Sequence, residues 1–170
     1  MGNITNGADL YDFEGYKIYR ATDFEFNDAY NITDGDGNPT FLEPYVQNGV
    51  RAQWDLVDGK SGWHPVDLNG IKFYLGDDTG LTHSYVDHNV VNGQRYYYAV
   101  VSYDYGGDLS NNIIPSDSPM KLRVNPLTGA VSLGPNVVEV VPSPPSAGFV
   151  DASFAGDQVD HVLGASSGEV

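Results

Sequence analysis

The feature that most limits the fold of this chain is the frequency of its turn residues. Glycine occurs 20 times and proline 10 times in 170 residues, and both interrupt regular secondary structure. No long window repeats apolar residues at the spacing of an amphipathic helix. Short runs rich in tyrosine, valine and isoleucine lie between the turns instead. Because these residues favour strands, the sequence predicts an all-β fold.

Two runs are the strongest strand candidates, residues 13–20 and residues 95–104. In the first run, alternation places Tyr16 and Ile18 on one face of the strand. The second run follows an Asn-Gly pair, which is a strong turn signal. Both of its faces are apolar or aromatic, so we expect a central strand that is covered on at least one side. Further strands are expected at residues 54–57, 71–75, 83–87 and 137–141, and the last strand of the sandwich at residues 120–124.

The order of several motifs resembles a fibronectin type III domain. Residues 13–20 (Phe-Glu-Gly-Tyr-Lys-Ile-Tyr-Arg) look like the third strand of that family, and residues 90–96 resemble the turn before its sixth strand. In the family, an apolar residue six positions before a tyrosine sets up a tyrosine corner, in which the hydroxyl bonds back to nearby backbone. Val90 and Tyr96 have this spacing. The resemblance implies a structural role for Tyr16, Ile18, Val90, Tyr96, Tyr98 and Val100.

The resemblance implies an immunoglobulin-like β-sandwich over residues 12–124, with a lead-in at 1–11. Residues 125–170 are then a C-terminal strand, a proline-rich linker and a tail. The sequence also resembles modules of large secreted proteins of Bacteroidota-like bacteria, whose third strand reads Asp-Phe-Glu-Gly-Tyr, as at residues 12–16. This likeness implies an extracellular or cell-surface multidomain protein, from which the chain is a piece.

The chain departs from the family in two ways. Residues 21–83 are far longer than the usual connection, so they form a large insertion. The family has two strands before its third, but here residues 3–10 lack strand alternation. A sandwich without these strands exposes backbone edges and part of its core. Three alternatives stay open: residues 137–141 fold back, the insertion supplies strands, or another molecule donates a strand.

Charge and composition exclude several classes of function. The net charge is −15, whereas nucleic acids and anionic membrane surfaces require lysine and arginine. The chain has no cysteine, so disulfides and thiolate chemistry are excluded. No apolar run approaches the ~20 residues of a transmembrane helix. Residues 1–9 do not form a signal peptide, so a secreted protein would carry its signal upstream.

Asp34, Asp36 and Asn38 alternate with glycines, as in the first half of a calcium-binding loop. Pro39 stands where an EF-hand needs its turn glycine, and Tyr45 where it needs a bidentate glutamate, so an EF-hand is excluded. Two interpretations remain. One is a solvated acidic turn, which Asp-Gly pairs favour, and the other is a looser surface site for Ca²⁺.

Three aromatic residues of the insertion are candidates for a carbohydrate site: Trp54, Trp63 and Tyr74. Aromatic rings on a sandwich face can stack on sugar rings, as they do in carbohydrate-binding modules. The alternative is that these rings cover the core beneath the insertion, and large aromatic residues usually act as buried packing mass.

The sequence lacks the motifs of catalysis. It has neither a Gly-x-Ser-x-Gly nucleophile motif nor a phosphate-binding P-loop. We therefore expect a non-enzymatic structural or assembly module of an extracellular multidomain protein or filament, with no cofactor unless Ca²⁺ binds. Its partners would be proteins, either identical subunits or neighbouring domains, and strand exchange with a neighbouring chain would complete the sheet. The alternative function is a module that binds carbohydrate or another ligand.

Overall fold

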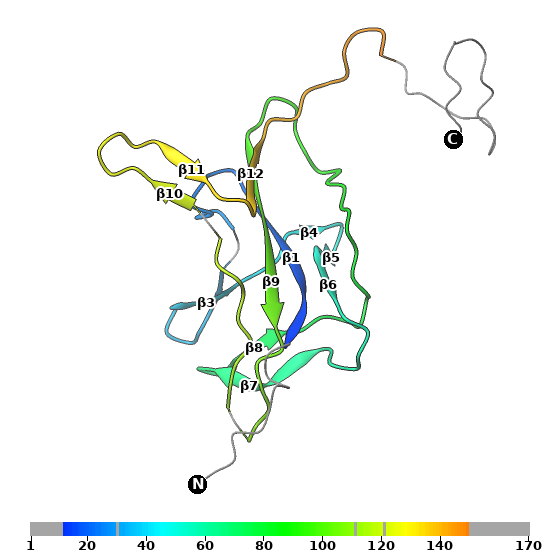
Figure 1. The fold of residues 1–170 in the computed structure, drawn as a ribbon, viewed down its shortest axis with the longest axis vertical. Coiled ribbons are helices and arrows are strands. Elements are labelled where there is room, and N and C mark those ends of the chain that lie inside the picture. Colours follow the sequence, from blue (N-terminus) through cyan, green and yellow to red (C-terminus); the bar gives the residue numbers. More distant parts are fainter. Residues whose placement is uncertain (1–11, 30, 111, 121, 150–170) are drawn as a thin grey trace, which may run out of the picture.

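The structure, a computed structural model, describes residues 12–29, 31–110, 112–120 and 122–149. In these residues it is all-β, with twelve strands, several antiparallel sheets and no helix (Figure 1), which confirms the predicted class. The strands are β1 (Phe13–Ala21), β2 (Asn31–Thr33), β3 (Pro39–Leu42), β4 (Val46–Gln47), β5 (Val50–Arg51), β6 (Gln53–Asp55), β7 (Trp63–Leu68), β8 (Ile71–Tyr74), β9 (Tyr96–Asp104), β10 (Leu122–Val124), β11 (Val131–Leu133) and β12 (Val137–Val140).

The main sheet has four antiparallel strands in the order β12-β9-β1-β6. Its centre is the pair of nine-residue strands β1 and β9, in which Ile18 lies opposite Val100. Tyr16 of β1 lies opposite Trp54 of β6. Both long strands are rich in tyrosine and β-branched residues, which favour extended backbone. The run predicted to be a central strand therefore is one, because β9 has a neighbour on each side.

The last strand of the main sheet differs from the prediction. The sequence placed it at residues 120–124, but β10 pairs only with β11, and β12 pairs with β9 instead. The reason lies in the turn after β10, where the Gly129 amide donates to the Asn125 carbonyl and reverses the chain. Val137 of β12, opposite Ala99, is buried and fixes the new strand on the sheet. Two of the three alternatives are therefore seen, since residues 137–140 fold back as β12 and the insertion supplies β6. Both strands extend this sheet and neither adds a second layer.

The insertion folds mainly as short hairpins, β2–β3, β4–β5 and β7–β8. The strands predicted at 54–57 and 71–75 correspond to β6 and β8 with slightly different ends. The strand predicted at 83–87 is not formed. The side chain of Gln47 takes the backbone groups there: its amide donates to the Val86 carbonyl, and its carbonyl accepts from the His88 amide. Side-chain bonds thus replace a strand ladder.

The core lies on one face of the main sheet. Its buried residues on the sheet include Tyr19, Ala21, Tyr97, Ala99, Val101 and Val137. The insertion covers them with Phe24, Phe26, Ala29 and Leu42, and the β10–β11 hairpin adds Leu122 and Leu133. A second cluster joins Phe73 and Leu75 to Tyr103 near the β7–β8 hairpin. Hereafter this side of the sheet is the covered face.

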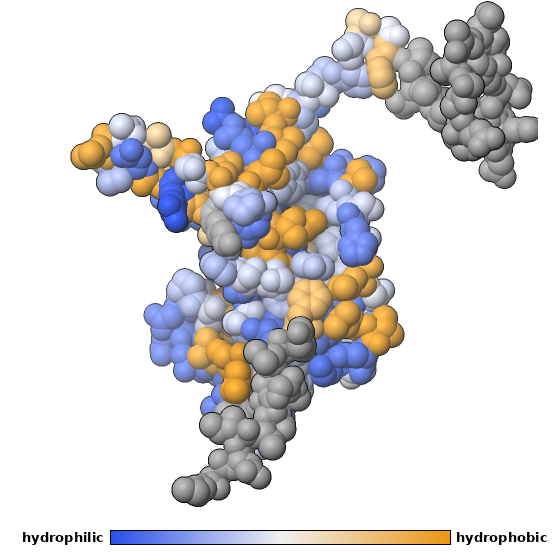
Figure 2. Space-filling view, in the orientation of Figure 1, coloured by the Kyte–Doolittle hydropathy of each residue, from blue (hydrophilic) through white to orange (hydrophobic). Residues whose placement is uncertain are grey.

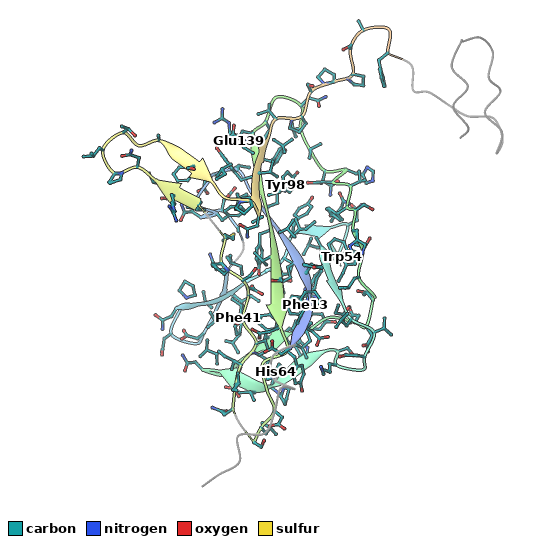
Figure 3. The ribbon with its side chains drawn as sticks, in the orientation of Figure 1. Phe13, Phe41, Trp54, His64, Tyr98 and Glu139 are labelled. Carbon is teal, nitrogen blue, oxygen red and sulfur yellow. The ribbon has the colours of Figure 1, made fainter. Side chains whose placement is uncertain are left out.

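The opposite side of the sheet is less buried than the covered face. Val100 is 47% exposed, whereas its neighbour Val101 is 1% exposed. Tyr16, Ile18 and Tyr98 share the side of Val100 and are half-buried. The physical reason is that the insertion packs Phe24 and Phe26 on the covered face, whereas its Trp54 lies at the edge of the opposite side. Figure 3 shows Phe41, from the insertion, and Trp54 on opposite sides of the β1–β9 pair.

The turn before β9 has the geometry of a tyrosine corner. Tyr96 is buried, and its hydroxyl accepts a hydrogen bond of 3.0 Å from the backbone amide of Val91. Val90, six positions before Tyr96, is half-buried. The bond fixes the entry of the chain into β9.

A partly buried ion pair crosses the covered face. The Nζ atom of Lys17 lies 3.2 Å from Asp117, which also accepts a bond from the Tyr19 hydroxyl. The same ammonium lies 3.6 Å from the ring centroid of Phe73. Burial lowers the pKa of Lys17 to about 8. These contacts fasten the segment after β9 to β1.

Two predicted regions lie outside the described residues. They are the lead-in at 1–11 and the part of the C-terminal extension beyond residue 149.

Candidate functional site

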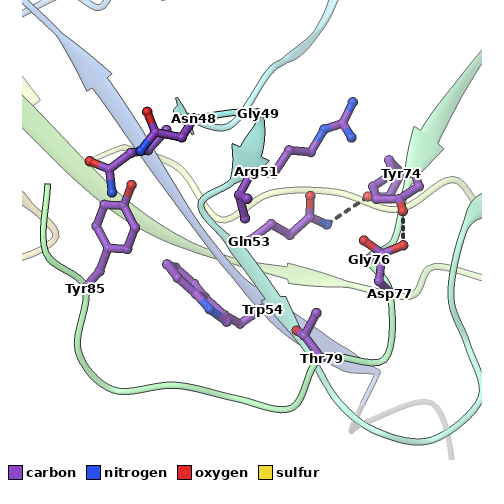
Figure 4. Close-up of a pocket in the computed structure, with 12 residues that line it drawn as sticks. Asn48, Gly49, Arg51, Gln53, Trp54, Tyr74, Gly76, Asp77, Thr79 and Tyr85 are labelled. Atoms are coloured by element: carbon purple, nitrogen blue, oxygen red, sulfur yellow. Dashed lines mark hydrogen bonds between the residues drawn. The ribbon is translucent and has the colours of Figure 1, made fainter. Parts of the chain in front are cut away.

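A hollow of about 540 Å³ lies beside β6, between the β4–β5 hairpin and the loop after β8 (Figure 4). Its lining residues include three with aromatic rings, two with charges and one largely buried amide: Trp54, Tyr74, Tyr85, Arg51, Asp77 and Gln53. Its size is within the range of sites for small ligands. We call it the aromatic hollow.

The rim of the aromatic hollow is a tight hairpin. Asn48 and Gly49 have φ values of 53° and 82°, the left-handed pair that a two-residue type I′ turn requires. Asparagine and glycine tolerate this region best, which explains why they connect β4 to β5. The hairpin places Arg51 beside the aromatic residues below it.

The walls are aromatic rings in contact with each other. The centroid of the Trp54 ring lies 5.4 Å from that of Tyr85. On the other side, the Tyr74 ring lies 5.0 Å from that of Trp63. The guanidinium of Arg51 lies 4.9 Å from the Tyr74 ring centroid, within the range of a cation–π contact.

The floor contains an unused hydrogen-bond acceptor. The Gln53 side chain is largely buried, and its amide group donates to the carbonyls of Tyr74 and Leu75 and to the Tyr103 hydroxyl. These bonds fix the amide, and its carbonyl oxygen has no partner among the described residues. The buried hydroxyl of Tyr85 likewise lacks one. Unpaired buried polar atoms are uncommon in native structures, so each of these two atoms needs an explanation.

The charges of the aromatic hollow are mostly balanced. Arg51 pairs with Glu43 at 2.6 Å. The Tyr74 hydroxyl donates to the carboxylate of Asp77, and this bond raises the pKa of Tyr74 to about 12. The hollow therefore offers neutral donors and acceptors in addition to one paired guanidinium and one carboxylate.

The structure separates the three aromatic residues singled out in the sequence. Trp54 and Tyr74 line the hollow, whereas Trp63 is not among its lining residues and packs on Tyr74 from β7, with 57% of its surface exposed. Sequence reasoning missed Gln53 and Tyr85. An Asn-Gly pair before Arg51 signalled the hairpin rim, but no local pattern marked Tyr85, because its position depends on a long loop.

A second surface of interest is the side of the main sheet opposite the core, which we call the open face. A shallow depression on it is lined by Tyr16, Ile18, Trp54, Tyr85 and Val100, among others. A neighbouring one shares Tyr16 and Val100. On β12, at the sheet edge, Val138 and Val140 are 52% and 39% exposed, and Figure 2 shows apolar residues gathered in the region of β12.

The segment that borders the open face, residues 81–85, belongs to no β-strand. Residues 81–85 form no backbone–backbone hydrogen bond with any described residue. The segment is instead held at Asp87, which accepts bonds from Arg20 at 2.8 Å and from the Tyr98 hydroxyl at 2.7 Å. Burial raises the pKa of the Asp87 carboxyl, but these bonds outweigh burial and the pKa is lowered overall.

The acidic turn in the insertion is closed by its own hydrogen bonds. The carboxylate of Asp34 accepts from the backbone amides of Asp36 and Asn38 at 3.0 and 2.9 Å, and from the Asn38 side chain. Bonds from Asn38 are the main reason that the pKa of Asp34 is lowered. The described residues hold no group of three or more His, Cys, Asp or Glu side chains placed for a metal ion. This geometry favours the turn, and Ca²⁺ binding there stays a prediction.

A scan against protein-family models and searches of curated proteins and of solved structures found no match to this chain. Within the described residues, no helix has the length and apolar character to cross a membrane. The two surfaces are therefore interpreted from their own chemistry.

Proposed function

We propose that this domain is a non-enzymatic assembly module whose main sheet is completed by a β-strand of a neighbouring polypeptide. The observation that carries the proposal is the open face, which is apolar where a sandwich has its core. Following the resemblance to secreted modules, we propose that it works outside the cell or at the cell surface.

The open face has the composition of an interface. Along the two central strands it presents Tyr16, Ile18, Tyr98 and Val100, with Trp54 at one edge and Val138 at the other. An antiparallel sheet with one solvated face normally alternates apolar and polar residues. Here both faces are apolar, and contiguous exposed apolar surface marks a site of interaction.

The order of the strands supports the sandwich interpretation. In immunoglobulin-like folds, the third, sixth and seventh strands form one sheet, and a second sheet packs on it. The strands that resemble the third and the sixth are β1 and β9, and they are neighbours, with β12 next to β9. In such a fold the second sheet would cover the side of Tyr16 and Val100.

A strand is the occupant that fits best, because unpaired backbone borders the open face. Apart from the Ser84 carbonyl, which accepts from the Thr82 hydroxyl, the amides and carbonyls of residues 81–85 have no partner among the described residues and are a template for β-strand addition. A strand paired there would lay alternate side chains toward Val100 and Ile18. A second copy of this chain fits less well, because each copy carries a net charge of −15.

A peptide probe tests this proposal. The probe is a synthetic peptide of about nine residues in which valine alternates with lysine or threonine, and the control peptide has the same composition without alternation. Hydrogen exchange of the amides at residues 81–85 is measured with each peptide. Only the alternating peptide is expected to slow this exchange. Val100→Lys is expected to abolish the effect, whereas Val131→Lys, an exposed valine on the separate β11 strand, leaves it intact.

Two results would overturn the proposal. Exchange that is unchanged by both peptides, or slowed equally by both, would show that residues 81–85 do not accept a strand. Light scattering that finds a stable dimer of the chain alone would make a second copy the occupant.

A further inference from the structure

We propose that the aromatic hollow binds a neutral carbohydrate. Trp54 and Tyr74 stack on its sugar rings, and the Gln53 carbonyl oxygen accepts a hydrogen bond from a sugar hydroxyl. The site lies beside the open face and shares Trp54 and Tyr85 with it, and the two kinds of binding can still be tested separately.

The aromatic walls suit the flat apolar faces of sugar rings. A pyranose ring presents C–H groups on its faces, and these pack well on aromatic rings, whose faces carry partial negative charge. Trp54 and Tyr74 are both half-buried, so packing holds each ring while part of it faces the hollow (Figure 4). Rigid aromatic walls lose little conformational entropy when a ligand binds.

The unpaired polar atoms suit hydroxyl groups. The Gln53 carbonyl oxygen can accept a hydroxyl hydrogen, and the Tyr85 hydroxyl can donate or accept. Because the Gln53 amide is fixed by three bonds to neighbouring groups, its acceptor is aligned before a ligand arrives. A ligand that pairs this acceptor gains a bond that the free protein does not make.

Charge selects a neutral ligand. The chain carries a net charge of −15, and the guanidinium of Arg51 is already paired with Glu43. An anionic sugar would meet the carboxylate of Asp77 without a free cation to offset it. Among the described residues, only the Nε–H of Arg51 donates a hydrogen bond, to Glu43, so its other N–H groups can donate to sugar oxygens at the rim.

Neutral and acidic oligosaccharides of matched length are the probes, cellohexaose and mannohexaose against hexagalacturonate. Binding is measured by isothermal titration calorimetry and saturation-transfer NMR on the full chain. We expect at least one neutral probe to bind and the acidic probe to bind at least tenfold more weakly. Trp54→Ala and Arg51→Ala should each weaken the neutral probe about tenfold or more. Trp63→Ala, an exposed tryptophan outside the hollow, should change affinity less than threefold.

Because Trp54 packs within the fold, circular dichroism and urea unfolding confirm that each variant is folded. Arg51 is exposed, so its variant keeps the test valid if Trp54→Ala unfolds. Neutral binding that survives Val100→Lys, with the peptide effect lost, separates this site from strand completion. The proposal is overturned if no neutral probe binds, if the acidic probe binds best, or if Trp63→Ala abolishes binding while Arg51→Ala does not.

Discussion

At the scale of single residues, Gly15 decides how closely β1 approaches β6. A Cβ atom at this position would overlap the carbonyl oxygen of Trp54 and come within 2.7 Å of the Tyr103 hydroxyl. Neither neighbour can retreat, since one is backbone and the other is buried. We expect Gly15→Ala to lower the free energy of unfolding by about 3 kcal/mol.

Urea unfolding measures this change, and Gly35→Ala is the matched control. Gly35 has no heavy atom within 4 Å of an added Cβ, so its substitution should alter stability by no more than about 0.5 kcal/mol. Equal losses for both variants would mean that the close approach at Gly15 is not what limits β1.

Glu14 makes the stability of the protein depend on pH. Its carboxylate is buried and accepts no hydrogen bond from a described residue, and the Nζ atom of Lys60 lies 3.9 Å away. Burial, reinforced by the nearby Asp58, raises the pKa of Glu14 from 4.5 to about 7. The folded state therefore binds a proton more tightly than the unfolded state does.

A raised pKa fixes the sign of the effect. The stability that protonated Glu14 contributes to the folded state is fully present below pH 4.5 and is lost as the pH rises through about 7. Between these pH values the free energy of unfolding of the unsubstituted protein should fall by up to roughly 3 kcal/mol relative to that of Glu14→Gln. The measurement is urea unfolding across this range for both proteins. Glu139→Gln, at a glutamate exposed on β12, is the control and should leave the slope of unfolding free energy against pH unchanged. If the unsubstituted protein and Glu14→Gln have the same slope, Glu14 is not the group responsible.

At the scale of elements, the two faces of β9 differ in a way that adjacent valines can test. Val101 is buried on the covered face and Val100 is 47% exposed on the open face. We expect Val101→Ala to lower the free energy of unfolding by roughly 2 kcal/mol, because it leaves a cavity. Val100→Ala should lower it by less than about 0.5 kcal/mol. Thermal and urea unfolding of the two variants give the comparison. The reverse order would show that Val100 contributes more to the core than Val101 does.

The sequence predicted β1 and β9 well because their patterns are local. Alternation and turn residues mark where such strands begin and end, and the spacing of Val90 and Tyr96 indicated the turn bond that the structure contains. Which face of β9 packs into the core could not be predicted in this way. Both faces of β9 are apolar, so the choice depends on where the insertion places Phe26 and Phe73, and such long-range packing leaves no local signal.

The short hairpins were missed for a different reason. Two of them turn at Asn-Gly pairs, residues 48–49 and 69–70, whose φ values are all left-handed. This signal was present in the sequence and indicates hairpins when flanked by strands. The flanking strands are short and partly polar, however, so their alternation is weak. The aromatic hollow was therefore predicted only through Trp54 and Tyr74, without its rim or its floor.

At the scale of the whole molecule, the two proposed surfaces meet at Trp54. Its ring lines both the aromatic hollow and the depression on the open face, and Tyr85 does the same. A strand added along residues 81–85 would therefore pass beside one wall of the hollow. We infer that partner binding and carbohydrate binding would affect each other if both occur, because they share this wall.

The charge of the whole chain gives a last prediction, which also decides the role of the acidic turn. With 23 acidic and 8 basic residues, self-repulsion lowers the stability of the folded state, and salt screens it. Raising NaCl from about 10 mM to about 500 mM should raise the Tm by several degrees.

Because Asp34 is already bonded by amides, CaCl2 at matched ionic strength should add nothing beyond MgCl2, and EDTA should leave the Tm unchanged. Scanning calorimetry measures these shifts. A rise specific to Ca²⁺ that is reversed by EDTA and absent in Asp36→Asn would instead establish a calcium site at Asp34, Asp36 and Asn38, since a ligand that binds only the native state must raise the Tm.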